Sequence, residues 1–183
     1  IDLVNIVRRP AQAELLAQQG ATEVVDSSSP DFVEQLTDAL RRTEATIAFD
    51  AIGGGELAST ILTAMEAASA PADGEYSRYG STTHKQVYIY GGLDRSPTIL
   101  DRSYGMAWSI GGWLLPNFLA AVGPERADQL RQRVADELTT TFASSYAFDL
   151  TLDQMLEPEQ MARYARMATG EKALVAPQAG ATG

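Results

Sequence analysis

Short apolar runs alternate with amphipathic segments along the first part of this chain. The runs are too brief for helices, and their residue types suit strands buried on both faces; they cover residues 2–8, 22–26 and 45–51. The segments that follow them place apolar residues at helical spacing, over residues 11–19, 31–42 and 56–69. This alternation predicts βαβ units with right-handed crossovers, and therefore an α/β fold with a doubly wound parallel sheet.

The rest of the chain continues the pattern with two interruptions. Further strands are expected over residues 86–93, 107–111, 146–152 and 172–175, and helices over 124–138, 157–168 and from near Pro116. Residues 70–85 and 94–105 are predicted to be irregular, and 177–183 to form a tail. The positions expected to face the core in the helices 31–42 and 124–138 are Phe32, Val33, Leu36, Leu40, Ala127, Leu130, Val134 and Leu138.

Two of the predicted strands end in consecutive glycines. They are T-I-A-F-D-A-I-G-G-G over residues 46–55 and Q-V-Y-I-Y-G-G-L over residues 86–93. Glycine allows positive φ and a close approach of a ligand to the backbone, and open α/β sheets bind ligands at the carboxyl ends of their strands. Turn geometry alone also requires glycine, so Gly53, Gly54, Gly91 and Gly92 have two interpretations. For Gly111 and Gly112, before Trp113, the alternative to ligand binding is close packing.

Polar residues at the strand ends add candidate chemistry. Arg8 and Arg9 end the first strand, where a dinucleotide fold faces the adenosine ribose. Guanidinium groups bind phosphate in a bidentate manner, so the pair indicates NADP rather than NAD, although it could equally be solubilising. Asp50 is expected to be a structural acid rather than a general base.

Composition excludes several classes of function. The chain has 183 residues, 45% of them hydrophobic, and a formal net charge of -10, which argues against broad binding of nucleic acid or anionic membranes. It has no cysteine and only one histidine, His84, which excludes disulfides and leaves too few ligands for a zinc site built from this segment alone. No apolar run spans a bilayer and no signal peptide is visible, so a cytoplasmic protein is expected. The start at Ile1, within a predicted strand, indicates a fragment of a longer protein.

The irregular stretch over residues 70–85 is longer than most helix-to-strand connections. Its larger side chains either line the mouth of a pocket or hold the loop in place; they are Tyr76, Arg78, Tyr79, His84 and Lys85. A solvated excursion is the favoured interpretation, although loops on rigid scaffolds do carry functional sites.

Several segments, taken in order, resemble the C-terminal half of a medium-chain dehydrogenase/reductase, the superfamily of zinc-type alcohol dehydrogenases and quinone oxidoreductases. I-V-R-R and L-L-A-Q-Q-G-A-T-E-V-V-D are similar to the second strand, helix and third strand of the family. F-D-A-I-G-G resembles the fourth-strand signature, Y-I-Y-G-G-L the fifth, S-I-G-G-W-L-L the sixth, and A-T-G-E-K-A-L-V-A-P the closing segment. The glycine fingerprint G-x-G-x-x-G is absent, so the sheet is expected to lack its first βα unit.

The resemblance implies an NAD(P)H-dependent oxidoreductase with a small-molecule substrate. Residues 1–139 would form a partial Rossmann domain, and residues 140–183 would return to the catalytic domain, whose catalytic residues would lie largely upstream of Ile1. By the same analogy, Arg8 and Arg9 would hold the 2′-phosphate and Lys172 would reach a phosphate. The adenosine side would be flanked by Ala51, Ile52, Gly53 and Gly54, and the nicotinamide end lined by Gly91, Gly92, Leu93, Ile110, Gly111, Gly112 and Trp113. Family members often form homodimers through the sixth strand, which corresponds here to residues 107–115.

Three functions remain open at this point. The favoured one is an NADPH-dependent reductase of the zinc-free quinone or enoyl reductase branch, which passes hydride to a carbonyl or an activated alkene. A zinc-dependent alcohol dehydrogenase is the enzymatic alternative. A dinucleotide-binding or dimerisation module without catalysis is the third, because the fragment lacks the pyrophosphate turn and would by itself be inactive.

Overall fold

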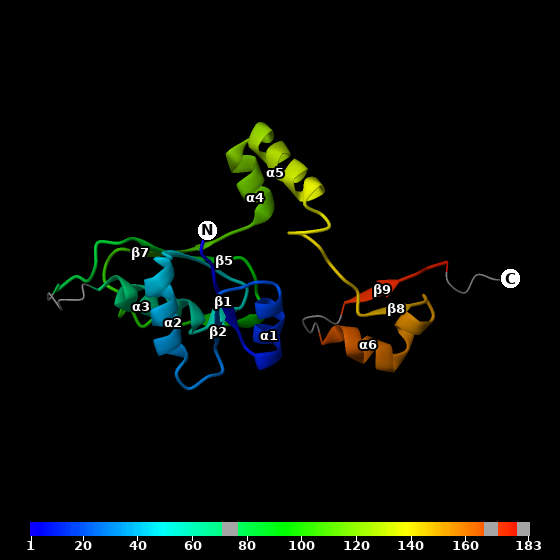
Figure 1. Cartoon of the computed structure of the whole chain (residues 1–183), viewed down its shortest axis with the longest axis horizontal. Coiled ribbons are helices and arrows are strands. Elements are labelled where there is room, and N and C mark those ends of the chain that lie inside the picture. The colour runs from blue at the N-terminus through cyan, green and yellow to red at the C-terminus, as the bar shows by residue number, and fades with distance from the viewer. Residues whose placement is uncertain (71–76, 167–171, 179–183) are drawn as a thin grey trace. The chain divides into compact units, whose positions relative to one another are not determined.

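The computed structural model describes residues 1–70, 77–166 and 172–178, which fall into two compact units, Ile1–Ala121 and Val122–Gly183 (Figure 1). The elements of the first unit are β1 (Val4–Val7), α1 (Pro10–Gln18), β2 (Glu23–Asp26), α2 (Phe32–Thr43), β3 (Ile47–Asp50), β4 (Gly53–Gly55), α3 (Leu57–Ser69), β5 (Lys85–Ile89), β6 (Asp94–Thr98), β7 (Trp108–Gly112) and α4 (Leu115–Val122). The second unit holds α5 (Pro124–Asp136), β8 (Phe148–Leu150), a short 3₁₀ helix (Gln154–Leu156), α6 (Pro158–Ala165) and β9 (Ala173–Val175). The predicted boundary after residue 139 stays a prediction.

Parallel strands form the framework of the first unit. β1 pairs with β2, and β5 lies between β3 and β7 in a three-stranded sheet. Every one of these pairs is parallel, as the strand-helix alternation predicts. The α/β fold with parallel sheets is therefore confirmed.

α2 and α3 together cover both sheets, and α1 also contacts β1 and β2. α2 and α3 pack against each other, α2 lies on β1 and β2, and α3 lies on β3 and β5. One continuous core joins them, with Leu36, Leu62 and Met65 among its fully buried side chains. In the described residues, however, β1 pairs only with β2 and β3 only with β5. The Rossmann strand order places its first strand between the equivalents of β1 and β3, so the interruption lies where the missing βα unit was expected.

The helix faces are only partly as predicted. Leu36 and Leu40 of α2 are buried, but Val33, in the first turn, is 49% exposed because it lies beside a surface depression instead of the core. In α5 only Ala127 is buried among the expected inward positions. Leu138 is exposed because the helix ends at Asp136, before it, and Val134 is also exposed.

The second unit contains a compact β-α-β arrangement. β8 pairs with β9 in parallel, and α6 follows the short 3₁₀ helix between them. The guanidinium carbon of Arg163 lies 3.5 Å from the centre of the Phe148 ring, and the Tyr164 hydroxyl donates to the Met155 carbonyl at 2.8 Å. Among the described residues of both units, no helix has the length and apolar content needed to cross a bilayer.

Candidate functional site

The two glycine turns interlock at the carboxyl edge of the β3-β5-β7 sheet. A β-carbon added to Gly91 would lie 2.8 Å from the α-carbon of Ala51, and one added to Gly53 would lie 2.7 Å from the Gly91 carbonyl oxygen. Backbone bonds join the same turns, because Asp94 N–H donates to the Ile52 carbonyl at 2.9 Å. Mutual packing of the turns therefore accounts for Gly53 and Gly91 without a ligand.

The turns extend into a small parallel ladder that the sequence did not predict. β4 pairs with β6, so the glycines Gly53–Gly55 form a strand, and part of the stretch 94–105 is regular. The Thr98 hydroxyl donates to the Gly53 carbonyl at 2.7 Å, and a side chain on Gly54 would lie 2.7 Å from the Ser96 carbonyl oxygen. The expectation that 94–105 is wholly irregular is wrong, because backbone pairing, rather than an apolar pattern, forms β6.

Asp50 holds the first of these turns in place. The residue is only 2% exposed, and its carboxylate accepts backbone N–H bonds from Ile52 at 2.7 Å and Gly53 at 3.3 Å. A carboxylate that caps its own turn in this way is structural, as the sequence indicated. The same bonds occupy two of the N–H groups that an anionic ligand would otherwise find at this edge.

A second part of the edge is open. β-Carbons added to Gly92 or Gly112 would meet no atom of the described residues within 4 Å, and Leu93 is 69% exposed. A β-carbon on Gly111 would only touch Gln86 and Tyr88 at ordinary distances of 3.8 and 3.9 Å. Close packing therefore does not explain Gly92 or Gly112, and the space beside β5 and β7 is where a ligand could approach the backbone.

Aromatic residues lie on the sheet face that α3 does not cover. Phe49 and Tyr88 stack with ring centres 5.5 Å apart, and Trp113 meets Phe49 at 6.1 Å and Phe118 at 5.7 Å. Ile110 alternates to the other face and packs on the core, so only its backbone is available to line a site. Of the predicted nicotinamide-end residues, those from Ile110 to Trp113 lie on β7 or directly after it, and their side chains do not all face one way.

Hydrogen bonds also connect three side chains that the sequence did not associate with one another. His84 Nε2 lies 3.0 Å from Ser109 Oγ, which in turn contacts Gln86 Oε1. Gln86 Nε2 donates to the Val87 carbonyl at 2.9 Å, so Oε1 must accept the Ser109 proton. Ser109 then accepts from His84, which leaves the serine without a base and excludes it as an activated nucleophile in this arrangement.

Arg8 and Arg9 lie at the carboxyl end of β1, as predicted. Both are exposed, Arg9 immediately precedes α1, and Arg8 N–H donates to Gln12 Oε1 at 3.1 Å. The end of β2 lies alongside, because Val7 is in register with Asp26 and its carbonyl accepts the Ser27 N–H at 2.7 Å. The Asp26 carboxylate is engaged by the Ser28 N–H and hydroxyl, each at 2.8 Å.

Lys172 belongs to the second unit. Its ammonium group binds the Ser144 hydroxyl and lies 5.4 Å from the centre of the Tyr146 ring. The phosphate contact predicted for Lys172 stays a prediction, as do the cofactor roles of the other predicted site residues. In the described ranges, no group of three or more His, Cys, Asp or Glu side chains is arranged to hold a metal ion.

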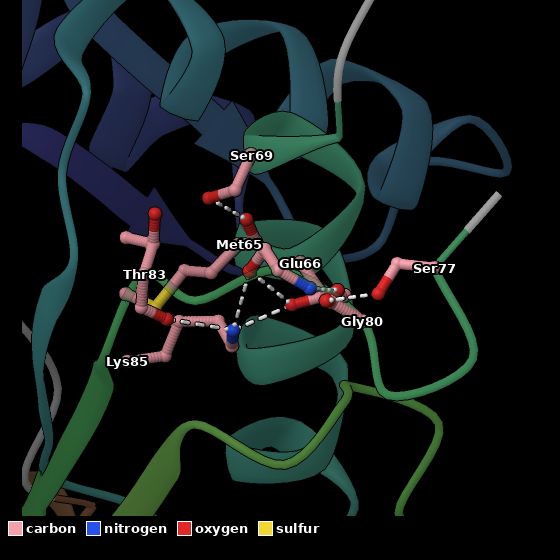
Figure 2. A network of polar contacts seen from close by, with 8 residues as sticks. Met65, Glu66, Ser69, Ser77, Gly80, Thr83 and Lys85 are labelled. Carbon is pink, nitrogen blue, oxygen red and sulfur yellow. Dashed lines mark hydrogen bonds and ion pairs between the residues drawn. The ribbon is translucent and has the colours of Figure 1, made fainter. Parts of the chain in front are cut away.

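Lys85 and Glu66 form a buried clamp at the opposite, amino edge of the sheet (Figure 2). Lys85 Nζ lies 2.5 Å from Glu66 Oε2 and also donates to the Thr83 carbonyl at 2.9 Å. Ser81 donates to the same carboxylate through its N–H at 2.6 Å and its hydroxyl at 2.7 Å. Of the two interpretations of the long loop, Lys85 therefore fits the one in which it holds the loop in place; Tyr76 lies outside the described residues.

Comparison with known proteins places this fold. No family model matches the sequence, and no curated protein matches it. Solved structures do match. A protein assigned as an NADPH:quinone reductase from Mesorhizobium loti has a TM-score of 0.69 and 23% identity, over 95% of this chain and 45% of its own. A mutant form of enoyl thioester reductase from Candida tropicalis has a TM-score of 0.58 and 16% identity, over 94% of this chain and 46% of its own.

A third similar structure, a point mutant of Etr1p, is a complex with NADP and crotonyl-CoA; its TM-score is 0.52 at 17% identity, over 91% of this chain and 44% of its own. This chain thus spans less than half the length of the structures it matches. The quinone and enoyl reductases among them are members of the medium-chain dehydrogenase/reductase superfamily, so the fold that the resemblance implied is confirmed. At these identities the likeness establishes the fold.

Proposed function

We propose that this chain is the cofactor-binding part of an NADPH-dependent oxidoreductase, which transfers hydride to a carbonyl or an activated alkene in the manner of quinone and enoyl reductases. The observation that carries the proposal is the exposed Arg8-Arg9 pair at the carboxyl end of β1, in a fold shared with NADPH-dependent reductases. Two guanidinium groups at this position suit a 2′-phosphate. A similar structure contains NADP.

The residues present fit part of such a cofactor. Arg8 and Arg9 suit the adenosine end, and the open backbone at Gly92 and Gly112 suits the nicotinamide end. The turn after β3 offers a cofactor fewer contacts, because Asp50 and β6 already occupy its polar groups and the space beside it. The residues of this turn are Ala51, Ile52, Gly53 and Gly54. The glycine-rich pyrophosphate turn would come from the βα unit that belongs between β1 and β3.

When bound, NADPH would supply the hydride, and the residues described here would orient it. Arg8 and Arg9 would fix the adenosine end by charge. The backbone at Gly92 and Gly112 would allow the nicotinamide ring to approach β5 and β7, beside the exposed Leu93. Substrate contacts would come mainly from a catalytic domain to which residues 140–183 return.

The proposal is tested by calorimetric titration of NADPH and NADH into the full-length polypeptide that contains this chain. An Arg8→Ala/Arg9→Ala variant is compared with Arg126→Ala/Arg131→Ala, which removes the same charge from exposed positions of α5. We expect NADPH affinity to fall to the NADH level in the first variant only. Equal NADPH affinity in all three proteins would contradict the 2′-phosphate site, and binding of neither cofactor would overturn the reductase function.

Homodimerisation through β7 is part of the same proposal. In the described residues β7 pairs on one side only, with β5, and the following Leu114 and Leu115 are more than half exposed. An exposed strand edge with apolar neighbours is suited to pairing with a second copy. Light scattering coupled to size-exclusion chromatography should give twice the mass of one chain for the parent protein. The Ile110→Pro variant should give the mass of one chain.

The edges of β1 and β3 that are unpaired in the described residues favour a second candidate, a dinucleotide-binding or dimerisation module without catalysis. A sheet interrupted at the pyrophosphate position would bind the adenosine end of the cofactor without completing an active site. The same titration separates the two, because the module would bind NADPH weakly and would not reduce quinones or enoyl thioesters in a substrate screen.

A further inference from the structure

A hollow of about 370 Å³ opens at the amino edge of the sheet, between the segments that lead into β5 and β7. Arg78 and Arg102 both line it, one from each segment. Two arginines in one hollow are notable in a chain with a net charge of -10, because acidic side chains are available to neutralise most cations. The predicted cofactor edge is at the other ends of the same strands, so this hollow is a separate feature.

Glu66 is the one carboxylate among the described residues that line the hollow, and its charge is already compensated. Its oxygens bind Lys85 Nζ (Figure 2) and also accept the Ser81 N–H and hydroxyl. Beyond the hollow, Asp101 accepts bonds from Ser59 and Ser103. Within the described residues, neither Arg78 nor Arg102 forms an ion pair, so no described carboxylate competes with a ligand for either guanidinium group.

The two arginine-bearing segments are fixed against each other. Met106 N–H donates to the Tyr79 carbonyl at 3.1 Å, and the Ser77 hydroxyl donates to the Gly80 carbonyl at 2.7 Å. A β-carbon on Gly80 would lie 2.7 Å from the α-carbon of Gly105, so the backbones pack directly. Because the backbone is already fixed, only the two arginine side chains lose conformational freedom when an anion binds.

Arg102 adds a conformational signal. Its φ is +61°, in the left-handed region that non-glycine residues rarely adopt. The neighbouring bonds of Ser103 to Asp101 and Thr63 hold this backbone in place. Strained residues persist only where the surrounding structure enforces them, and they cluster at ligand sites.

We infer that this hollow binds a phosphate-class dianion through the guanidinium groups of Arg78 and Arg102. Arginine forks match the geometry of phosphate oxygens, and two of them suit a doubly charged group better than chloride or a single carboxylate. The dianion is either inorganic phosphate or the phosphate of an organic molecule. In the second case the ring of Tyr79, 66% exposed and 5.7 Å from the Arg78 guanidinium carbon, provides a surface for the organic part. The inference does not depend on the proposed reductase function.

Calorimetric titration of the full chain with inorganic phosphate tests the inference, in the absence of any nucleotide and with potassium chloride at matched ionic strength as the blank. We expect a dissociation constant of about 1 mM or tighter for phosphate. Arg78→Gln and Arg102→Gln should each weaken binding by about ten-fold or more, because each removes one guanidinium fork. Arg95→Gln, a change at an exposed arginine on β6, should leave the affinity unchanged.

Arg102→Gly separates binding from folding. Glycine accepts a positive φ without strain, so this variant should be at least as stable as the parent while losing phosphate affinity. Unchanged affinity in Arg102→Gly and Arg78→Gln, or a parent chain that responds to phosphate no more than to chloride, would overturn the inference.

Phenyl phosphate distinguishes the two sources of the dianion. Tighter binding of phenyl phosphate than of inorganic phosphate, lost in Tyr79→Ala, would support the phosphate of an organic molecule. Equal affinity for both, unaffected by Tyr79→Ala, would support inorganic phosphate as the ligand.

Discussion

Gly91 lies directly against Ala51, so that a β-carbon on Gly91 would lie 2.8 Å from the Ala51 α-carbon. The turn after β5 therefore rests on the turn after β3, with only backbone at the contact. Gly92, the next residue, would meet no described atom within 4 Å if it gained a side chain. The two adjacent glycines therefore have different structural roles. Gly91 is required for packing of the turns, whereas Gly92 leaves an open surface.

We predict opposite phenotypes for alanine at these two positions. Gly91→Ala should lower the free energy of unfolding by about 1–3 kcal/mol, because one of the two turns must move. Gly92→Ala should leave the stability within about 0.5 kcal/mol, the usual range for a surface change, and should weaken NADPH binding in the full-length polypeptide. Urea denaturation and calorimetric titration measure the two effects. Equal loss of stability in both variants would contradict the open surface at Gly92.

The buried clamp at the amino edge gives a second prediction. Glu66→Gln should lower the free energy of unfolding by about 3–5 kcal/mol at pH 7, because Lys85, with a fully buried side chain, would lose the carboxylate that pairs with it. The exposed Glu34→Gln on α2 serves as the control and should cost much less. Urea denaturation of both variants beside the parent chain measures the difference.

The cost of Glu66→Gln should also depend on pH. Burial acts to raise the pKa of Glu66, but hydrogen bonds from Lys85 and Ser81 outweigh it and lower this pKa below the ordinary value of 4.5. A carboxyl group whose pKa is lowered by folding stabilises the native state above 4.5, and that contribution is lost as the pH falls through the lowered pKa. The difference between parent and variant should therefore shrink below pH 4.5. A difference that is the same at pH 7 and at acid pH would show that the charge of Glu66 is not responsible.

Most of the fold follows from local patterns in the sequence. β1, α1, β2, α2 and β3 appear in the predicted order, because parallel strands are continuous apolar runs and the helices between them carry apolar residues at a helical period. The expectation that the strands are buried on both faces is wrong for β3, since Ile47 and Phe49 are more than half exposed on the face that α3 does not cover. β6 could not be predicted in this way. Its residues, D-R-S-P-T, are all exposed and include a proline, and they form a strand only because the glycines of β4 offer a backbone to pair with.

The candidate site was harder to predict than the fold. The sequence placed glycines at the strand ends, but only the register of neighbouring turns decides which of them have space beside them. The chain from His84 through Ser109 to Gln86 depends on the pairing of Gln86 with Ser109 across β5 and β7, which the sequence does not specify. Arg102 was not identified from the sequence either, since the feature that distinguishes it is a left-handed backbone angle.

Tyr104 provides a third prediction. Its side chain is fully buried and packs edge-on against Trp108 at 4.8 Å, but its hydroxyl has no hydrogen-bond partner among the described residues. Removing a buried hydroxyl without a partner is neutral or stabilising, so Tyr104→Phe should raise the free energy of unfolding by up to about 1 kcal/mol. Tyr164→Phe is the matched control: its hydroxyl donates to the Met155 carbonyl, and its loss should cost about 0.5–1.5 kcal/mol. The midpoint of thermal denaturation should therefore rise for Tyr104→Phe and fall for Tyr164→Phe. A lower midpoint for Tyr104→Phe would show that the hydroxyl does have a partner.

The interrupted sheet yields a prediction for individual backbone amides. In β3 the carbonyls of Thr46 and Asp50 accept bonds from β5, so the alternate residues Ile47 and Phe49 direct their N–H groups to the other edge. That edge is unpaired in the described residues. In this chain we therefore expect fast hydrogen exchange at Ile47 and Phe49 and slow exchange at Ala48, which faces β5.

A longer polypeptide that supplies the first βα unit should change this pattern. A parallel strand placed between β1 and β3 would accept the Phe49 N–H, and exchange at Ile47 and Phe49 should slow toward the rate of Ala48. The Val87 amide, in the middle of β5, is already inside the three-stranded sheet and should be unaffected, which makes it the internal control. Exchange followed by NMR in both polypeptides measures the change. Slow exchange at Phe49 in the short chain would mean that this edge is already protected, and would contradict the proposal that a strand of the dinucleotide fold belongs there.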